Sequence, residues 1–256
     1  MAKATRTTAG GTDLVQVQLL TLRDRLMTLI LEVIACSLAD AVEAERGGAG
    51  RLEIVRELQR GGLTPSFDLV AEVKQRVDIP VRVMLRESDG FGMAGESESD
   101  RLCAAAERLA ALEVDGLVLG FLKDGEVDIA LTQRVLAHAP DTRATFHHAF
   151  EAARDKSSAL TAIKRLPQVD RVLSHGGTDG LDLRVKRLKQ YATMSAPELI
   201  VVAGGGINDD AISQISRKTN IREFHVGRAA RSQFQVDGSV QATLVKALVN
   251  SMGQQL

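Results

Sequence analysis

The chain is poor in large aromatic side chains and in net charge. Its 256 residues include no tryptophan and one tyrosine, so it lacks the aromatic platforms on which proteins stack nucleic-acid bases. The formal net charge of −1 gives no basic field that would attract nucleic acid or an anionic membrane surface. These deficits argue against nucleic acid and membranes as partners.

Cysteine and long apolar runs are also scarce. Cys36 and Cys103 are the two cysteines, and they form neither a CxxC motif nor a ligand-like cluster. This usage is typical of a reducing cytoplasm and indicates no disulfide framework. No run approaches the ~20 apolar residues of a membrane span, and no signal-peptide core is visible. We therefore expect a cytoplasmic protein.

What is present is a regular alternation of β-branched runs and amphipathic stretches. The runs predict strands at 29–35, 51–55, 81–86, 115–120, 143–147, 170–174, 199–204 and 222–226. The stretches predict helices at 37–47, 66–77, 97–112, 128–139, 155–166, 179–191, 208–218 and 239–251. Eight βα units in a row predict an α/β fold, the (β/α)₈ or TIM barrel, as a single domain. An open doubly wound sheet is the alternative, because the same alternation can produce it.

The barrel domain is expected to occupy residues 27–256. Residues 1–26 are small, polar or mixed in character, and we expect a disordered N-terminal extension. A short helix covering the barrel floor or a partner is the competing interpretation.

Polar side chains recur on one face of several predicted strands. Strand alternation places apolar residues under the outer helices and the opposite face inside the barrel. That inner face would hold Glu32, Glu53, Arg86, Thr145, His147 and His225. A structural ion-pair network would explain them, since buried charges need partners. Their convergence near strand ends favours a catalytic site.

The roles follow from the chemistry of these groups. Glu32, Glu53 and His147 are candidates for general acid and base. Arg86 would stabilise a developing oxyanion, and His225 would complete the polar cluster. For the pair His147-His148, one alternative is an inward and an outward imidazole, with only His147 functional.

Three consecutive glycines, Gly204 to Gly206, follow the seventh predicted strand and open a helix. Gly227 and Arg228 follow the eighth. Loops after the last two strands of a barrel often hold a phosphate on backbone N–H groups, and glycine lets the anion approach. We predict an anion or phosphate site at Gly205, Gly206, Gly227 and Arg228, with tight turns as the plainer alternative.

Taken together, these stretches resemble the CutC family, whose members are described as copper homeostasis proteins. The matching stretches are LEVIACS (31–37), RLEIV (51–55), GGLTPS (61–66), VMLR (83–86), LVLGFLKDGEVD (117–128), TFHHAF (145–150), RVLSHGG (171–177), VAGGGI (202–207) and EFHVGRAA (223–230). The resemblance runs from about Met27 to Ala230. It implies a (β/α)₈ barrel, copper handling and a homodimer or larger homo-oligomer.

The chain departs from the family pattern at several places. Ile34 and Val55 stand where the family tends to have cysteine, and the nearby thiol is Cys36. Arg86 is not followed by the usual Pro-Arg, and His148 replaces an arginine. These departures indicate a divergent branch with its own substrate.

The residues favour an enzyme over a copper protein. Cu(I) prefers thiolate and thioether ligands, and Cys36, Cys103, Met84 and Met93 form no cluster. The sequence requires no cofactor, but it leaves a divalent metal or copper open. The candidate metal ligands are Glu32, Glu53, His147, His225 and Cys36.

The sequence thus predicts an isomerase or lyase that performs acid/base chemistry on a small phosphorylated or anionic sugar-like substrate. Copper binding, as the family name implies, is the alternative. A non-catalytic barrel that binds a small anion is the second alternative.

Overall fold

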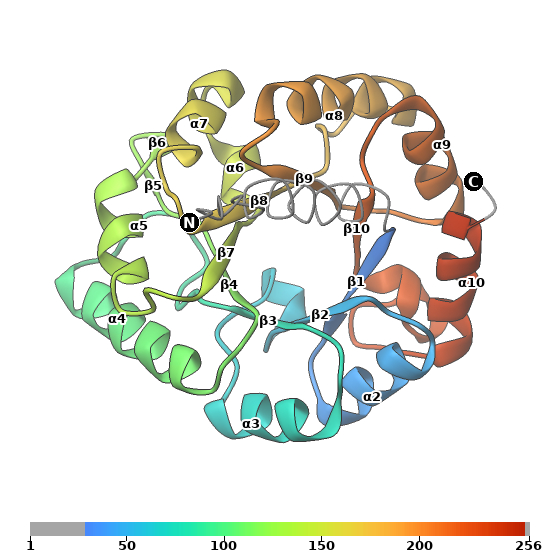
Figure 1. The fold of residues 1–256 in the computed structure, drawn as a ribbon, viewed down its shortest axis with the longest axis horizontal. Coiled ribbons are helices and arrows are strands. Elements are labelled where there is room, and N and C mark those ends of the chain that lie inside the picture. Colours follow the sequence, from blue (N-terminus) through green and yellow to red (C-terminus); the bar gives the residue numbers. More distant parts are fainter. Residues whose placement is uncertain (1–28, 254–256) are drawn as a thin grey trace, which may run out of the picture.

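Eight parallel strands close into a barrel in the order β1-β10-β9-β8-β7-β4-β3-β2, and helices surround it (Figure 1). This is a computed structural model, which describes residues 29–253. The barrel strands are β1 (Ile30–Ala35), β2 (Arg51–Ile54), β3 (Val81–Met84), β4 (Gly116–Leu119), β7 (Arg143–Phe146), β8 (Val169–Ser174), β9 (Ile200–Ala203) and β10 (Glu223–Val226). The predicted (β/α)₈ barrel is confirmed, and the open sheet is excluded by the pairing of β1 with β10. The predicted extension at 1–26 lies outside the described residues.

The main helices follow the strands as the sequence predicts. They are α2 (Leu38–Arg46), α3 (Phe67–Arg76), α4 (Glu96–Ala111), α5 (Ile129–Leu136), α7 (Lys156–Ile163), α8 (Leu181–Ser195), α9 (Asp209–Lys218) and α10 (Ala242–Gly253). The side chains of Ser37, Ser66, Asp128 and Asn208 each accept a backbone N–H at the start of a helix. These hydrogen bonds satisfy donors that have no partner inside the helix.

Several short elements lie in the connections and were not predicted. A hairpin of β5 (Leu122–Lys123) and β6 (Glu126–Val127) turns through Asp124 and Gly125, both with positive φ. A four-residue helix, α6 (Ala149–Ala152), follows β7, and 3₁₀ turns follow β2 and β10. Such short segments have too few residues to produce a periodic pattern.

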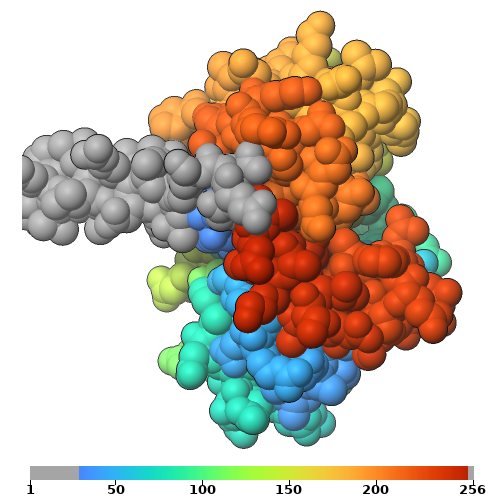
Figure 2. Space-filling view, turned by 90° about the vertical axis from the view of Figure 1, so that its right-hand side faces the viewer, coloured from blue at the N-terminus to red at the C-terminus, as the bar shows by residue number. Residues whose placement is uncertain are grey.

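The hydrophobic core lies between the barrel wall and the helices. Leu31, Val33, Leu52 and Phe224 are at most 1% exposed and belong to this layer. The predicted alternation is therefore confirmed for β1, β2 and β10. Figure 2 shows where the ring closes: α10 in red lies between α9 in orange and α2 in blue. Within residues 29–253, no helix is long and apolar enough to cross a membrane.

Candidate active site

The inner face of the barrel holds two layers of polar side chains. In the lower layer, the Arg51 guanidinium donates to Glu32 and, at 2.6 Å, to Glu223. Arg171 donates to both carboxylate oxygens of Glu223, at 2.7 and 2.9 Å. These side chains come from β1, β2, β8 and β10, so the ion pairs tie distant strands together across the barrel. The layer is the structural network that the sequence left open as an alternative.

A second ion-pair group occupies the opposite side of this layer. Arg82, on β3, is 1% exposed. Its guanidinium donates to both oxygens of Asp170, at 2.9 and 3.1 Å, and to the Thr145 hydroxyl at 2.7 Å. Asp115 accepts from Arg82 Nε at 3.1 Å. Thr145 therefore belongs to the structural layer.

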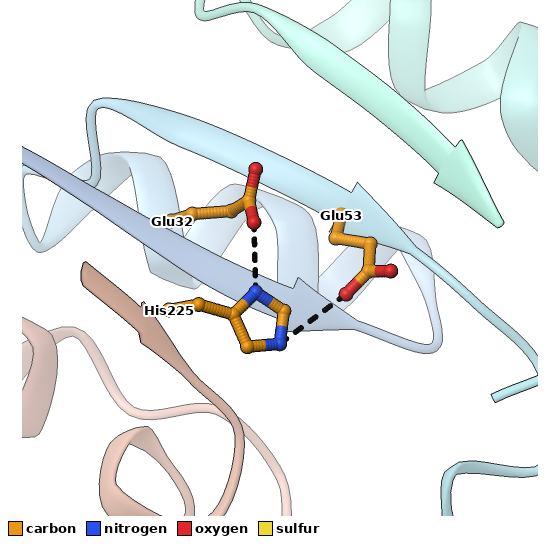
Figure 3. A group of neighbouring side chains, drawn as sticks. All are labelled: Glu32, Glu53 and His225. Atoms are coloured by element: carbon orange, nitrogen blue, oxygen red, sulfur yellow. Dashed lines mark hydrogen bonds and ion pairs between the residues drawn. The ribbon is translucent and has the colours of Figure 1, made fainter. Parts of the chain in front are cut away.

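Above this layer, the His225 imidazole lies between two carboxylates (Figure 3). Its Nδ1 is 2.7 Å from Glu32 Oε1, and its Nε2 is 3.4 Å from Glu53 Oε2. The strand register brings these three side chains together. Glu32 on β1 lies opposite His225 on β10, and β2, which carries Glu53, pairs with the other edge of β1. The three side chains are 2–5% exposed. The carboxylate of Glu32 fixes the tautomer and orientation of the ring, and Nε2 is left facing Glu53.

The environments of the two glutamates drive their pKa values apart. Burial would raise the pKa of Glu32, but the Arg51 guanidinium and His225 reverse the effect and hold it far below the ordinary value. Burial, reinforced by the charge on Glu32, raises the pKa of Glu53 to about 7. Burial would lower the pKa of His225, but the carboxylates of Glu53 and Glu32 raise it. Glu32 is thus held as an anion, while Glu53 titrates near neutrality beside an imidazole whose pKa is raised.

Glu53 opens into a cavity of about 320 Å³ at the carboxyl ends of the strands. Its Oε1 is buried and has no hydrogen-bond partner among the described residues. The cavity is lined by Ile34, Glu53, Val55, Leu58, Arg60, Gly61, Met84, Arg86, Phe91, His147, His148, Leu173 and His225. Of the predicted catalytic residues, Glu53, Arg86, His147 and His225 reach this cavity. Glu32 does not line it and touches it only through His225.

Arg86 extends over the mouth rather than into the barrel centre. Its guanidinium donates to the backbone carbonyls of Arg60 and Gly62 at 3.2 Å and of Asp89 at 2.7 Å. It also lies over the Phe91 ring, 5.3 Å from the centroid. Arg86 Nε is buried without a partner in the described part of the chain. A cationic group held by carbonyls, with one N–H left over, is suited to an oxygen anion of a ligand.

Two adjacent histidines line the same cavity. Burial, with help from nearby cations, lowers the pKa of both His147 and His148 to about 3, so both rings are neutral at physiological pH. His147 Nδ1 accepts the Ala149 N–H at 3.2 Å. The outward alternative for His148 is wrong, because the ring lines the cavity and its buried Nδ1 has no partner within residues 29–253. The error arises because His148 lies beyond the end of β7, where strand alternation no longer applies.

The predicted anion loops line a second cavity of about 210 Å³, which adjoins the first. Gly205, Gly206, Gly227 and Arg228 all contribute to it. Gly205 and Gly206 have φ near +68°, and a Cβ on Gly205 would lie 2.5 Å from His175 Cβ. Glycine is therefore required at Gly205 on two grounds, whereas a Cβ on Gly206 would meet open space.

Charges around the glycine loop are mixed. Arg184 donates to the carbonyls of Gly204 and Gly205, at 3.3 and 2.5 Å, and Arg228 is exposed at the rim. Asp209 and Asp210 occupy the first turn of α9 and bring negative charge to that helix end. Attraction for an anion therefore depends on the two arginines, of which the sequence predicted Arg228 alone.

Three side chains of the array are chemically able to ligate a metal ion. Glu32, Glu53 and His225 each offer one ligand atom, all within 4.8 Å of one another. However, Glu32 already accepts from Arg51, whose cationic guanidinium opposes a nearby metal ion. His147 is outside this trio. The arrangement suits a shared proton better than a divalent cation.

Cys36 lies apart from the trio. It lines a third cavity with Arg231, whose NH2 is 3.4 Å from Cys36 Sγ. Burial raises the pKa of the Cys36 thiol, with Arg231 opposing this only in part. Cys103 is buried in α4. A neutral thiol beside a guanidinium is an unfavourable ligand for Cu(I).

The fold and the site define a TIM-barrel protein with an acid–imidazole–acid array at its mouth. The CutC family model matches residues 29–230. A CutC family protein from Xylella fastidiosa is 34% identical over 203 residues, covering 79% of this chain and 75% of the relative. The mouse copper homeostasis protein cutC homolog is 36% identical over 201 residues, covering 77% and 72% of the two chains. The chain therefore belongs to the CutC family.

Solved structures agree with this assignment. A CutC protein of Streptococcus agalactiae superimposes with a TM-score of 0.73 at 25% identity, covering 77% of this chain and 98% of that one. Phosphoribosylanthranilate isomerase of Thermotoga maritima has a TM-score of 0.55 at 10% identity, covering 88% and 99%. The second similarity concerns the barrel fold alone.

Proposed function

We propose that this CutC-family barrel is an enzyme that moves a proton on a small anionic, sugar-like molecule, as an isomerase or lyase does. The observation that supports it most is Glu53. This buried carboxyl lines the cavity, has a pKa of about 7, keeps one oxygen without a hydrogen-bond partner among the described residues, and adjoins an imidazole. A general base works best when its pKa lies near the operating pH.

The proposed chemistry assigns one role to each group. Glu53 Oε1, when ionised, removes a proton from a carbon next to a carbonyl of the substrate. The electron pair of the broken C–H bond moves onto the carbonyl oxygen, where the free N–H of Arg86 stabilises the resulting oxyanion. The proton of the hydroxyl on the deprotonated carbon then passes to this oxyanion, and Glu53 returns its own proton to the former carbonyl carbon. The deprotonated carbon thereby becomes the new carbonyl, which completes an isomerisation. His225 tunes Glu53 by sharing a proton with it, and Glu32 holds His225.

The test measures exchange of carbon-bound hydrogen, so the native substrate need not be known. A panel of aldose and ketose phosphates is incubated with the protein in D₂O, and loss of C–H signals is followed by NMR. We expect wild type to exchange at least one compound. We expect Glu53→Gln to exchange it about 10²- to 10⁴-fold more slowly, the usual contribution of a general base.

The control is Glu72→Gln, since Glu72 is exposed on α3. This variant should keep the wild-type exchange rate. If Glu53→Gln exchanges as fast as wild type, the enzyme proposal is wrong. If the compound binds both proteins but neither exchanges its protons, the non-catalytic anion-binding barrel is supported instead.

Copper handling is the second candidate, favoured by the names of the mouse and Streptococcus proteins. Cys36 packs against a small apolar cluster that includes Met84, so a thiol and a thioether share one region. The guanidinium of Arg231 beside the thiol opposes a cation there. We expect anaerobic Cu(I) titration to show no stoichiometric binding. Stoichiometric binding in wild type that is lost in Cys36→Ser would support copper as the ligand.

The proposal extends to the ligand, the oligomeric state and the cellular location of the protein. A small anionic molecule is the partner, and the family resemblance supports assembly as a homodimer in the cytoplasm. Sedimentation velocity of the full chain tests the assembly, since a monomer at micromolar concentration would contradict it.

A further inference from the structure

Two of the cavities are neighbours that share four residues. Ile34, Leu58, His148 and His225 line both the Glu53 cavity and the glycine cavity. His148 and His225 are the polar members of this shared wall. His225 is fully engaged, with Nδ1 near Glu32 and Nε2 near Glu53. His148 is therefore the polar group at the junction that has hydrogen-bonding capacity left.

The environment of His148 keeps its ring neutral. His225, His175 and Arg86 surround it, and its ring centroid lies 6.0 Å from that of His175. A neutral imidazole has one N–H donor and one acceptor nitrogen. Because Nδ1 is buried and unpartnered in the described residues, it has a hydrogen bond to give or receive. Leaving such an atom unpaired is unfavourable, and a hydrogen bond to a ligand hydroxyl would remove that cost.

We propose that the two cavities form one substrate site and that His148 is the substrate-contacting residue at their junction. The occupant is a phosphorylated sugar of about five carbons. Its phosphate lies against Gly205, Gly206 and Arg228, its carbonyl end lies against Glu53 and Arg86, and a hydroxyl between them bonds to His148. This rests on the anion site of the proposed function and adds the residue that links it to the acid/base pair.

The size of the site supports this class of ligand. Cavities of roughly 300–1,000 Å³ hold small-molecule ligands, and neither inorganic phosphate nor a free pentose would fill both chambers. Joining the two halves in one molecule should give tighter binding than either half alone, because the second contact becomes intramolecular. Loss of a contact residue at the junction should therefore weaken binding of the joined molecule and leave binding of inorganic phosphate unchanged.

The test uses ribose 5-phosphate, with inorganic phosphate and ribose as the two halves. Binding to full-length protein is followed by NMR of the glycine amides and of the ¹⁵N-labelled histidine rings. The chain has five histidines, so His→Gln variants assign each ring. We expect ribose 5-phosphate to shift the ring nitrogens of His148 and the amides of Gly205 and Gly206 together. Inorganic phosphate should shift the glycine amides without the ring.

Substitutions measure the contribution of His148. His148→Leu should bind ribose 5-phosphate about tenfold more weakly, the value of one hydrogen bond, with binding of inorganic phosphate unchanged. His148→Gln keeps a donor and an acceptor and should recover part of the loss. His138→Gln is the control. His138 is exposed just after the end of α5, and this variant should bind ribose 5-phosphate as wild type does.

Three results would overturn the inference. In the first, ribose 5-phosphate shifts the glycine amides but not the His148 ring. In the second, none of the three probes shifts the His148 ring. In the third, His148→Leu and wild type bind ribose 5-phosphate equally. Failure of the enzyme proposal is distinguished by a different measurement. In that case Glu53→Gln exchanges carbon-bound hydrogen at the wild-type rate, and this result does not depend on whether His148 contacts the ligand.

Discussion

At the scale of single residues, chemical identity matters less than which partner each carboxylate meets. Glu32 and Glu53 both adjoin His225, yet the Arg51 guanidinium bonds to Glu32 and not to Glu53. Together with His225 this contact keeps Glu32 an anion, whereas burial raises the pKa of Glu53 to about 7. Two identical side chains thus acquire different roles from their surroundings.

The raised pKa of Glu53 predicts how stability depends on pH. Its folded-state value of about 7 exceeds the ordinary value of 4.5, so the folded protein binds more protons between these limits. The stabilisation from protonated Glu53 is therefore complete below pH 4.5 and is lost as the pH rises through 7. Glu53→Gln lacks this dependence.

Urea unfolding of wild type and Glu53→Gln across this range checks the prediction. We expect the unfolding free energy of wild type to fall relative to the variant by on the order of 3 kcal/mol between acid and alkaline pH. His225 changes the result in the same direction, since its pKa is also raised. A difference between the two proteins that stays constant with pH would contradict it.

At the scale of elements, two of the barrel strands each supply a lower, structural residue and an upper, functional one. β2 provides Arg51 below and Glu53 above, and β10 provides Glu223 below and His225 above. Successive inward side chains are two residues apart, so the layers follow from strand alternation. The lower layer joins strands that are distant in sequence and supports the upper one.

Removing one arginine from the lower layer should be costly. Arg82→Ala removes a buried guanidinium that donates to Asp170, Asp115 and Thr145, and it leaves Asp170 with Arg171 as its remaining ion-pair partner. We expect a loss of about 3 kcal/mol, because several buried polar contacts are broken by one change. Arg134→Ala removes exposed pairs with Glu96 and Asp100 and should cost less than ~1 kcal/mol. Equal losses in urea unfolding would refute a structural role for the lower layer.

Much of the architecture could be predicted from the sequence, because helix and strand periodicities are local. Ser37 and Asn208 marked helix starts within one residue, and alternation placed Glu53 and His225 on the inner face. The pairing of those residues could not be predicted. It depends on the register between strands such as β1 and β10, which lie nearly two hundred residues apart. The orientation of the His148 side chain could not be predicted either, because His148 lies beyond the end of β7, where strand alternation no longer applies.

At the scale of the whole molecule, barrel closure creates the site. The first and last strands, β1 and β10, pair directly, which brings Glu32 next to His225. The neighbouring strand β2 places Glu53 on the other side of the His225 imidazole. The closure also joins the glycine loop after β9 to the acid/base cavity. A protein that keeps the individual strands but fails to close would have neither the array nor the junction at His148.

The central claim is that Glu53 gains or loses its proton near neutral pH inside the closed barrel. Its side-chain carboxyl ¹³C resonance, assigned by its absence from Glu53→Gln, reports this directly and needs no substrate. We expect a titration midpoint near pH 7, with Glu32 remaining ionised throughout. A midpoint near the ordinary glutamate value of 4.5 would show that Glu53 does not titrate near neutrality.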